Sequence, residues 1–232
     1  MRQPAKSISQ NNQDTEFLPG IEDFALDEDA NEIYVADGTR NKRVVVFDMK
    51  TGAFKRGWGG HGVPLSEIDN DPTPPYDISG PPPDQKPFAP ALHCIHLSKD
   101  GLVYVCERGS DRIQVFTKDG RFITSYFVHP STQARGANCG GPFAAVGPCG
   151  TVYNLTFSHD PGQKYLLVAD GTNNMVWILN RKDGTVAGSF GGNGRYAGQL
   201  HWIDTIGIDS KGNVYTGEVE DGKRIQKFRL AN

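Results

Sequence analysis

Four carboxylates recur at equivalent places along the chain, each at the end of an alternating apolar run. They lie 70, 63 and 48 residues apart, as Asp37, Glu107, Asp170 and Glu218. An arginine begins the next apolar run in three of the four copies, at Arg43, Arg112 and Arg224. Carboxylates can act as acids, bases or metal ligands, but a residue type that recurs in each repeat usually serves the repeat itself. We therefore expect these acids to bind turn amides and the nearby arginines.

The four cysteines form two pairs. Cys94 and Cys106 lie symmetrically about Asp100, so a hairpin that turns there would place them opposite each other. We expect this pair to be reduced and buried as small hydrophobic side chains. Cys139 and Cys149 bracket a Gly/Pro loop, and they either stay reduced or form a disulfide, which would require an oxidising compartment.

Several classes of function are disfavoured. The sequence has no G-x-S-x-G, P-loop or H-E-x-x-H motif. The net charge of -3 and the lack of a Lys/Arg cluster argue against a nucleic-acid partner. No apolar stretch reaches the length of a membrane span. The polar residues 1–17 have no apolar h-region, so we expect a disordered tail and no signal peptide in this chain.

The elements that must position these residues come from a fourfold repeat. One phrase, an apolar run, an acid, a polar turn and a second apolar run, occurs four times, at Ile33–Phe47, Val103–Phe116, Leu166–Leu179 and Val214–Phe228. A short alternating run precedes each copy, and a further strand follows the first three. The unit is a four-stranded antiparallel meander, and stacking such units around an axis gives a β-propeller.

This pattern predicts an all-β propeller at 18–232, with blades near 18–58, 90–128, 151–190 and 201–230. Two long loops separate the first three blades, at 59–89 and 129–150. The fourth blade lacks its last strand. We expect the four visible blades to be part of a six-bladed ring, the alternative being a small four-bladed one.

The phrases VADGTRNKRVVVFD, ERGSDRIQVFTKDGRF and VADGTNNMVWIL, with the tails Trp58-Gly59 and Phe190-Gly191-Gly192, resemble the NHL-repeat family of β-propellers. The resemblance is closest to secreted bacterial members of unassigned function, which implies a secreted or periplasmic protein. The chain is more distantly similar to the propeller of the peptidyl-α-hydroxyglycine α-amidating lyase, which holds zinc through histidines on its inner strands.

The resemblance to the lyase implies a site at one position of each inner strand. Aligning the first strands puts Glu22, His93, Tyr153 and Asp204 at that position. His93 matches a lyase ligand, and Arg108 matches its catalytic arginine. Asp204 stands where the family has histidine, and Thr39 stands where the lyase has its catalytic tyrosine.

These inner-strand residues would face a central channel, where they form either a metal or small-ligand site or a hydrated polar funnel. Glu22, His93 and Asp204 are the candidate metal ligands: an imidazole with carboxylates suits zinc, and carboxylates alone would prefer calcium. If the channel is only a hydrated polar funnel, we expect no cofactor. Tyr153, Trp202 and His201 are the candidate ligand-binding residues, with Trp202 at the channel mouth.

Three functions fit this sequence. The first is a scaffold that binds a protein, peptide or glycan partner through the face loops. The second is a metal-dependent lyase or hydrolase that acts in the channel and uses Arg108. The third is a structural subunit that assembles through its blade edges. The sequence leaves the oligomeric state open.

Overall fold

The computed structural model describes residues 11–71, 86–89, 91–129, 150–219 and 222–229 of the chain. Within these residues the regular structure is all-β apart from three short 3₁₀ turns, η1 (Gly60–Gly62), η2 (Leu65–Glu67) and η3 (Arg108–Ser110). No helix in this described part is long and apolar enough to cross a membrane.

Four antiparallel sheets follow one another along the chain. The first contains β1 (Ile21–Asp27), β2 (Glu32–Asp37), β3 (Arg43–Asp48) and β4 (Phe54–Trp58). The second contains β5 (Leu92–Leu97), β6 (Leu102–Glu107), β7 (Arg112–Thr117) and β8 (Phe122–Phe127). The third contains β9 (Asn154–Phe157), β10 (Tyr165–Asp170), β11 (Met175–Asn180) and β12 (Val186–Gly191). The fourth contains β13 (Ile203–Ile208), β14 (Val214–Glu218) and β15 (Arg224–Phe228).

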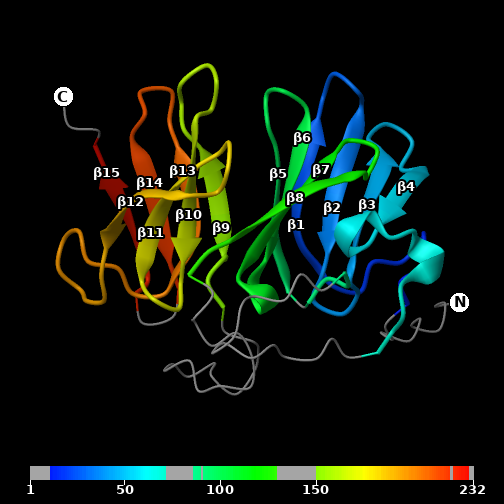
Figure 1. Cartoon of the computed structure of the whole chain (residues 1–232), viewed down its shortest axis with the longest axis horizontal. Helices are drawn as coiled ribbons and strands as arrows, with labels where there is room; N and C mark the ends of the chain where they lie inside the picture. Colours follow the sequence, from blue (N-terminus) through cyan, green and yellow to red (C-terminus); the bar gives the residue numbers. More distant parts are fainter. Residues whose placement is uncertain (1–10, 72–85, 90, 130–149, 220–221, 230–232) are drawn as a thin grey trace, which may run out of the picture.

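The sheets are the blades of a β-propeller. In each blade every strand pairs only with its neighbours in sequence, so each blade is a meander. The first blade lies at one end of the series and the fourth at the other (Figure 1). Contacts between blades join the inner strands β1 to β5, β5 to β9 and β9 to β13. The prediction of an all-β propeller with four blades is confirmed, and the prediction of a six-bladed ring stays a prediction.

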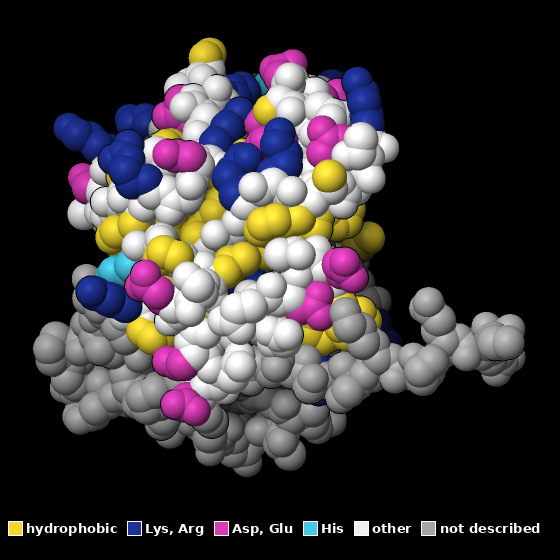
Figure 2. Space-filling view, turned by 90° about the vertical axis from the view of Figure 1, so that its right-hand side faces the viewer, with side chains coloured by type: hydrophobic (Ala, Val, Ile, Leu, Met, Phe, Trp, Pro, Cys, Tyr) yellow, Lys and Arg dark blue, Asp and Glu magenta, His cyan; other side chains and the backbone are white. Residues whose placement is uncertain are grey.

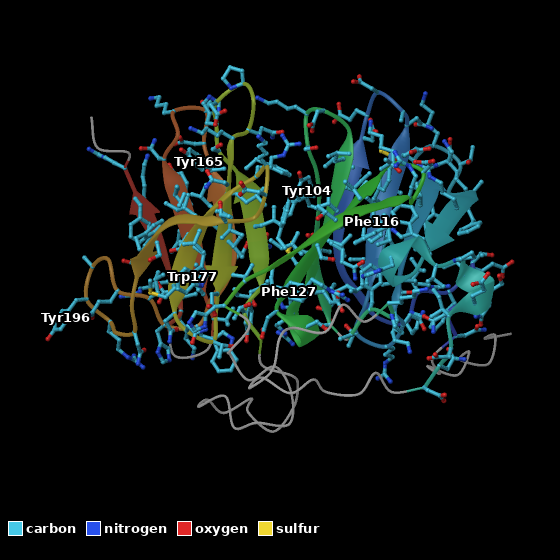
Figure 3. All side chains as sticks on the ribbon, in the orientation of Figure 1. Tyr104, Phe116, Phe127, Tyr165, Trp177 and Tyr196 are labelled. Carbon is cyan, nitrogen blue, oxygen red and sulfur yellow. A yellow bond between two sulfur atoms is a disulfide. The ribbon has the colours of Figure 1, made fainter. Side chains whose placement is uncertain are left out.

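The alternating sequence of the strands explains why the blades stack. Successive side chains of a strand point to opposite faces, so a strand that is apolar on both faces must be covered twice. Tyr34 and Val44 of the first blade pack against Ile95 and Phe116 of the second in one apolar core. A second core joins blades two and three, and a third joins blades three and four. Figure 3 shows Tyr104 and Phe116 among the side chains that fill these spaces.

Three of the four recurring acids form ion pairs with an arginine of their own blade. Arg43 Nε donates to Asp37 Oδ2 at 2.8 Å, and both side chains are fully buried. Arg112 pairs with Glu107 at 2.7 Å, and Arg224 pairs with Glu218 at 2.8 Å. Each pair ties the end of the second strand to the start of the third. The structural use that the repeat predicts for these acids is thus observed.

The third blade departs from this pattern because Met175 stands at the position of the arginine. Asp170 instead accepts hydrogen bonds from Trp177 Nε1 at 2.8 Å and from the backbone and side-chain nitrogens of Asn173 at 2.9 and 2.8 Å. Burial raises the pKa of Asp170, although these three hydrogen bonds oppose the shift.

Cys94 and Cys106 form a disulfide between β5 and β6. The expectation that this pair is reduced is therefore wrong. The two residues are directly opposed in the strand register, and their Cα atoms are 4.8 Å apart, within the range that a disulfide spans. The predicted alternatives for Cys139 and Cys149 lie outside the described residues.

Part of the N-terminal segment contacts the first blade. Asn12 is fully buried, and its side-chain oxygen accepts a hydrogen bond from the Lys42 backbone nitrogen at 2.8 Å. Arg43 Nη1 donates to the Asn12 backbone oxygen at 2.8 Å. Residues 11–17 belong to the segment that the composition assigns to the polar tail. Asn12 in this segment thus contacts Arg43, a member of the buried ion pair of the first blade.

Candidate functional site

The structure places the four aligned residues at the start of the inner strands. Glu22 lies on β1, His93 on β5 and Asp204 on β13, while Tyr153 directly precedes β9. The register is interrupted at Glu22, at His93 and at Asp204, so each of the three is the extra residue of a β-bulge. Bulges redirect a side chain out of the regular alternation and are enriched next to functional sites. A local irregularity thus presents these three side chains at the same end of their blades.

His93 connects residues of three blades. Its Nδ1 lies 2.7 Å from the Tyr153 backbone oxygen, which can only accept a hydrogen bond, so Nδ1 carries the proton and donates it. Its Nε2 lies 3.6 Å from Asp204 Oδ1 on the fourth blade. The His93 and Tyr153 rings are 5.2 Å apart. Residues from blades that are not neighbours therefore meet near the propeller axis.

The charges around His93 favour its neutral form. Burial is the main cause that lowers the pKa of His93, and the Arg108 guanidinium lowers it further. The carboxylates of Asp204 and Glu22 act in the opposite direction and do not reverse the shift. A neutral imidazole with its Nδ1 proton engaged leaves the Nε2 lone pair facing the Asp204 carboxylate.

Arg108 forms the second half of the cluster. It lies in η3, directly after β6, and its guanidinium carbon stands 4.9 Å from the centre of the Tyr153 ring. Its Nε is buried and has no hydrogen-bond partner in the part of the chain that the structure describes. Burial raises the pKa of the Tyr153 phenol, so this ring stays neutral under the cation. A buried donor without a partner costs free energy that an incoming acceptor would recover.

Glu22 is at the edge of the cluster and already has a partner. Its carboxylate accepts a hydrogen bond from the Thr39 hydroxyl on the loop between β2 and β3. The alignment identifies Thr39 only as a position that has lost a tyrosine. The hydrogen bond gives this residue a use that the sequence pattern does not reveal.

His201 and Trp202 lie on the loop before β13. The His201 backbone nitrogen donates to Glu218 Oε2 at 2.8 Å, and its ring Nδ1 is 3.5 Å from Asn193 Oδ1. The Trp202 backbone nitrogen donates to Asn174 Oδ1 at 2.6 Å, at a positive φ of 50°. These contacts position the two residues through the fourth and third blades. Their role in ligand binding stays a prediction.

Two donors of the predicted metal site, His93 and Asp204, lie close together, and Glu22 is engaged with Thr39. Among the described residues, no group of three or more His, Cys, Asp and Glu side chains is arranged to hold a metal ion. Two zinc ligands, each about 2.0–2.2 Å from a tetrahedral ion, lie roughly 3.4 Å apart. The observed 3.6 Å is close to that separation, so the pair fits part of a metal site.

Comparisons with known proteins support the family and the fold. Residues 18–47, which include β1 and β2 and most of β3, match the model of the NHL repeat. No curated protein matches the chain in a sequence comparison. The prediction of an NHL-repeat β-propeller is confirmed, whereas the similarity to the amidating lyase is not.

Two solved structures share the arrangement of the blades. The hydrazine synthase of Kuenenia stuttgartiensis is similar over 88% of this chain and 44% of its own, with a TM-score of 0.56 and 13% identity. A streptogramin B lyase is similar over 91% of this chain and 55% of its own, with a TM-score of 0.51 and 15% identity. The chain thus spans only about half the length of these structures, and at such identities the likeness shows the fold alone.

Proposed function

We propose that this NHL-repeat β-propeller is a binding scaffold that holds an extended peptide segment of a partner protein at the face where its inner strands begin. The observation that supports the proposal most directly is the cluster of His93, Arg108, Tyr153 and Asp204. It offers a donor without a partner at Arg108 Nε beside acceptors at His93 Nε2 and Asp204. A peptide backbone presents N–H and C=O groups together, so it can use both kinds of group.

The two long loops adjoin the cluster in sequence. Two residues separate the segment 59–89 from β5, the strand that carries His93, and the segment 129–150 ends three residues before Tyr153. A partner held by these segments would lie over the inner-strand cluster. The parts of both segments at 72–85 and 130–149 lie outside the described residues, so the proposal depends on the cluster.

The test is selection of peptides from a random library displayed on phage, followed by direct titration of the selected peptides. We expect Arg108→Gln and Asp204→Asn each to weaken binding at least tenfold, since each removes one side of the hydrogen-bonding pattern. Arg121→Gln is the matched control, because Arg121 is an exposed arginine of the turn between β7 and β8. Failure to select any peptide, or equal affinity in Arg108→Gln and Arg121→Gln, would refute the proposal.

A second candidate is a metal-dependent lyase or hydrolase, favoured by the facing His93 Nε2 and Asp204 Oδ1. A metal held there by His93 and Asp204 would supply Lewis-acid chemistry, and Arg108 would stabilise negative charge on a substrate. Catalytic zinc sites usually have three protein ligands, and the described residues offer two within reach.

Metal analysis of the purified protein separates the two candidates. We expect less than one tightly bound zinc per chain. Stoichiometric zinc that is lost on His93→Ala, and retained on His96→Ala, would favour the enzyme. His96 is the matched control because it lies on the same strand and its ring binds Asn154 Oδ1 at 2.9 Å.

A further inference from the structure

The back face of the first blade exposes positions that are buried in every other blade. Ile95, Leu155 and Ile206 occupy one position of the inner strand and face the preceding blade, at 0%, 0% and 6% exposure. Phe24 occupies that position in the first blade and is 55% exposed. The side chain is as apolar as its counterparts, but among the described residues no preceding blade covers it.

A second row, at or just before the first residue of the inner strand, behaves in the same way. Leu92, Val152 and Ile203 are fully buried against the preceding blade, whereas Ile21 in the first blade is 53% exposed. Figure 2 views the molecule from the first blade, at the right of Figure 1, and shows a band of hydrophobic side chains across this side. We call Ile21, Phe24 and Leu26 the back face of the first blade.

The fourth blade has the complementary exposure on its front face, by which we mean the face that packs against the following blade in blades one to three. The second residues of the third strands in blades one to three are fully buried against the following blade: Val44, Ile113 and Val176. Ile225 is their counterpart on β15 and is 78% exposed. The strand β15 is also the outer strand of its sheet, whereas β3, β7 and β11 each pair with a fourth strand. Ile225 and Tyr215 mark the front face of the fourth blade.

We propose that a second copy of this chain covers these faces, with the front face of the fourth blade of one copy packed on the back face of the first blade of the other. The argument is the repeat itself, because three front-to-back interfaces with the same positions already exist in one chain. The back face of the first blade and the front face of the fourth blade have the positions of a fourth such interface, and both are exposed. Such a head-to-tail contact is heterologous, and it closes into a ring when the rotation permits.

The exposure of these apolar side chains gives the association its driving force. Burying apolar surface is favourable in proportion to its area, and a continuous apolar patch on a soluble protein usually marks an interaction site. Among the described residues, nine large apolar side chains are exposed, and five belong to the first blade: Ile21, Phe24, Leu26, Met49 and Phe54. Three of these five, Ile21, Phe24 and Leu26, form the back face of the first blade, and Ile225 lies at the other end of the series.

The test is the mass of the full chain in solution, measured by light scattering during size exclusion over a range of concentrations. We expect the wild type to show a mass of two or more chains. Phe24→Asp and Ile225→Asp should each weaken association at least tenfold. Val186→Asp is the matched control and should associate as the wild type does, because Val186 is 58% exposed on the outer strand β12 and belongs to neither face. Circular dichroism checks that each variant keeps its β-sheet content.

An equimolar mixture of the two variants tests the head-to-tail geometry. One interface between Phe24→Asp and Ile225→Asp copies is unaltered, so the mixture should recover association that neither variant shows alone. A monomeric wild type would overturn the proposal. So would association that Ile225→Asp leaves intact, which indicates back-to-back pairing, or association that Val186→Asp weakens as much as the other two variants do.

Discussion

At the scale of single residues, the protonation state of His93 depends on burial and on contacts with residues distant in sequence, and not on its neighbours in sequence. Its ring is tied at Nδ1 to the third blade and faces the fourth blade at Nε2. Burial lowers the pKa of His93, and Arg108 lowers it further. The lowered pKa favours the neutral imidazole at neutral pH, with an unprotonated Nε2 that can accept a hydrogen bond.

The lowered pKa of His93 makes stability depend on pH. Because the folded-state pKa lies below the unfolded value of about 6.5, the unfolded state binds more protons between these two values. The stability that neutral His93 contributes is fully present above about pH 6.5 and is lost as the pH falls through the folded-state pKa. Urea unfolding should show that the free energy of unfolding falls more between pH 7.5 and 5.5 for the wild type than for His93→Gln.

His159→Gln is the control for this comparison, since His159 is exposed in the turn between β9 and β10. It should keep the pH dependence of the wild type. Identical slopes for the wild type and His93→Gln would mean that His93 is not protonated differently in the folded and unfolded states.

The sequence could identify part of the site. Aligning the repeats places Glu22, His93, Tyr153 and Asp204 at one inner-strand position, and the structure brings three of them together, with Glu22 at the edge. The β-bulges that direct their side chains leave no mark in the pattern of apolar residues. The stacking of Arg108 on Tyr153 and the hydrogen bond of Thr39 to Glu22 depend on contacts between segments that are distant in sequence.

At the scale of elements, the acid and the arginine act as one unit in the hairpins of blades one, two and four. Asp37 and Arg43 are both fully buried, so removing the carboxylate leaves a buried charge without its partner. Asp170 has neutral donors in place of the arginine, and its raised pKa means that burial disfavours its ionised form. The same residue type therefore has different energetic consequences in two copies of one repeat.

This difference predicts unequal losses of stability for a matched pair of variants. Asp37→Asn should lower the free energy of unfolding by about 3–5 kcal/mol, the usual cost of breaking a buried ion pair from one side. Asp170→Asn should cost about 1 kcal/mol, the value of one imperfectly replaced hydrogen bond. Urea unfolding of both variants at pH 7 provides the measurement. A larger loss in Asp170→Asn than in Asp37→Asn would contradict the assignment of roles.

The hairpin of the second blade gives a further prediction. The disulfide between Cys94 and Cys106 closes a loop of 12 residues and should stabilise the fold by about 2–3 kcal/mol. Reduced wild-type protein should lose this stability relative to oxidised protein in urea unfolding. The variant Cys94→Ala/Cys106→Ala keeps Cys139 and Cys149, so an equal loss on its reduction would assign the effect to that second pair.

The symmetry of the hairpin could predict that Cys94 and Cys106 face each other, and it does so correctly. It could not predict that they are joined, because the opposed position suits two packed thiols as well as a disulfide. The strand pairing is local and is therefore readable from alternation and turn residues. The bond depends on the distance between the two strands and on redox conditions, neither of which the pattern contains.

At the scale of the whole molecule, the repeat predicts the number and type of blades but not how the series closes. Closure depends on the angle between blades, which many small packing differences determine together. The structure has packed apolar cores between the blades and two outer faces where Phe24 and Ile225 are exposed. Within the described residues, the blades pack closely on one another, and the outer faces of the first and fourth blades carry exposed apolar side chains.

The central claim is that inner strands from blades that are not neighbours meet at one polar site, and titration of the His93 ring by NMR tests it most directly. The account predicts a His93 pKa below 6.5, which falls further in Asp204→Asn and rises in Arg108→Gln, because the carboxylate raises this pKa and the guanidinium lowers it. A His93 pKa that neither substitution changes would contradict the account.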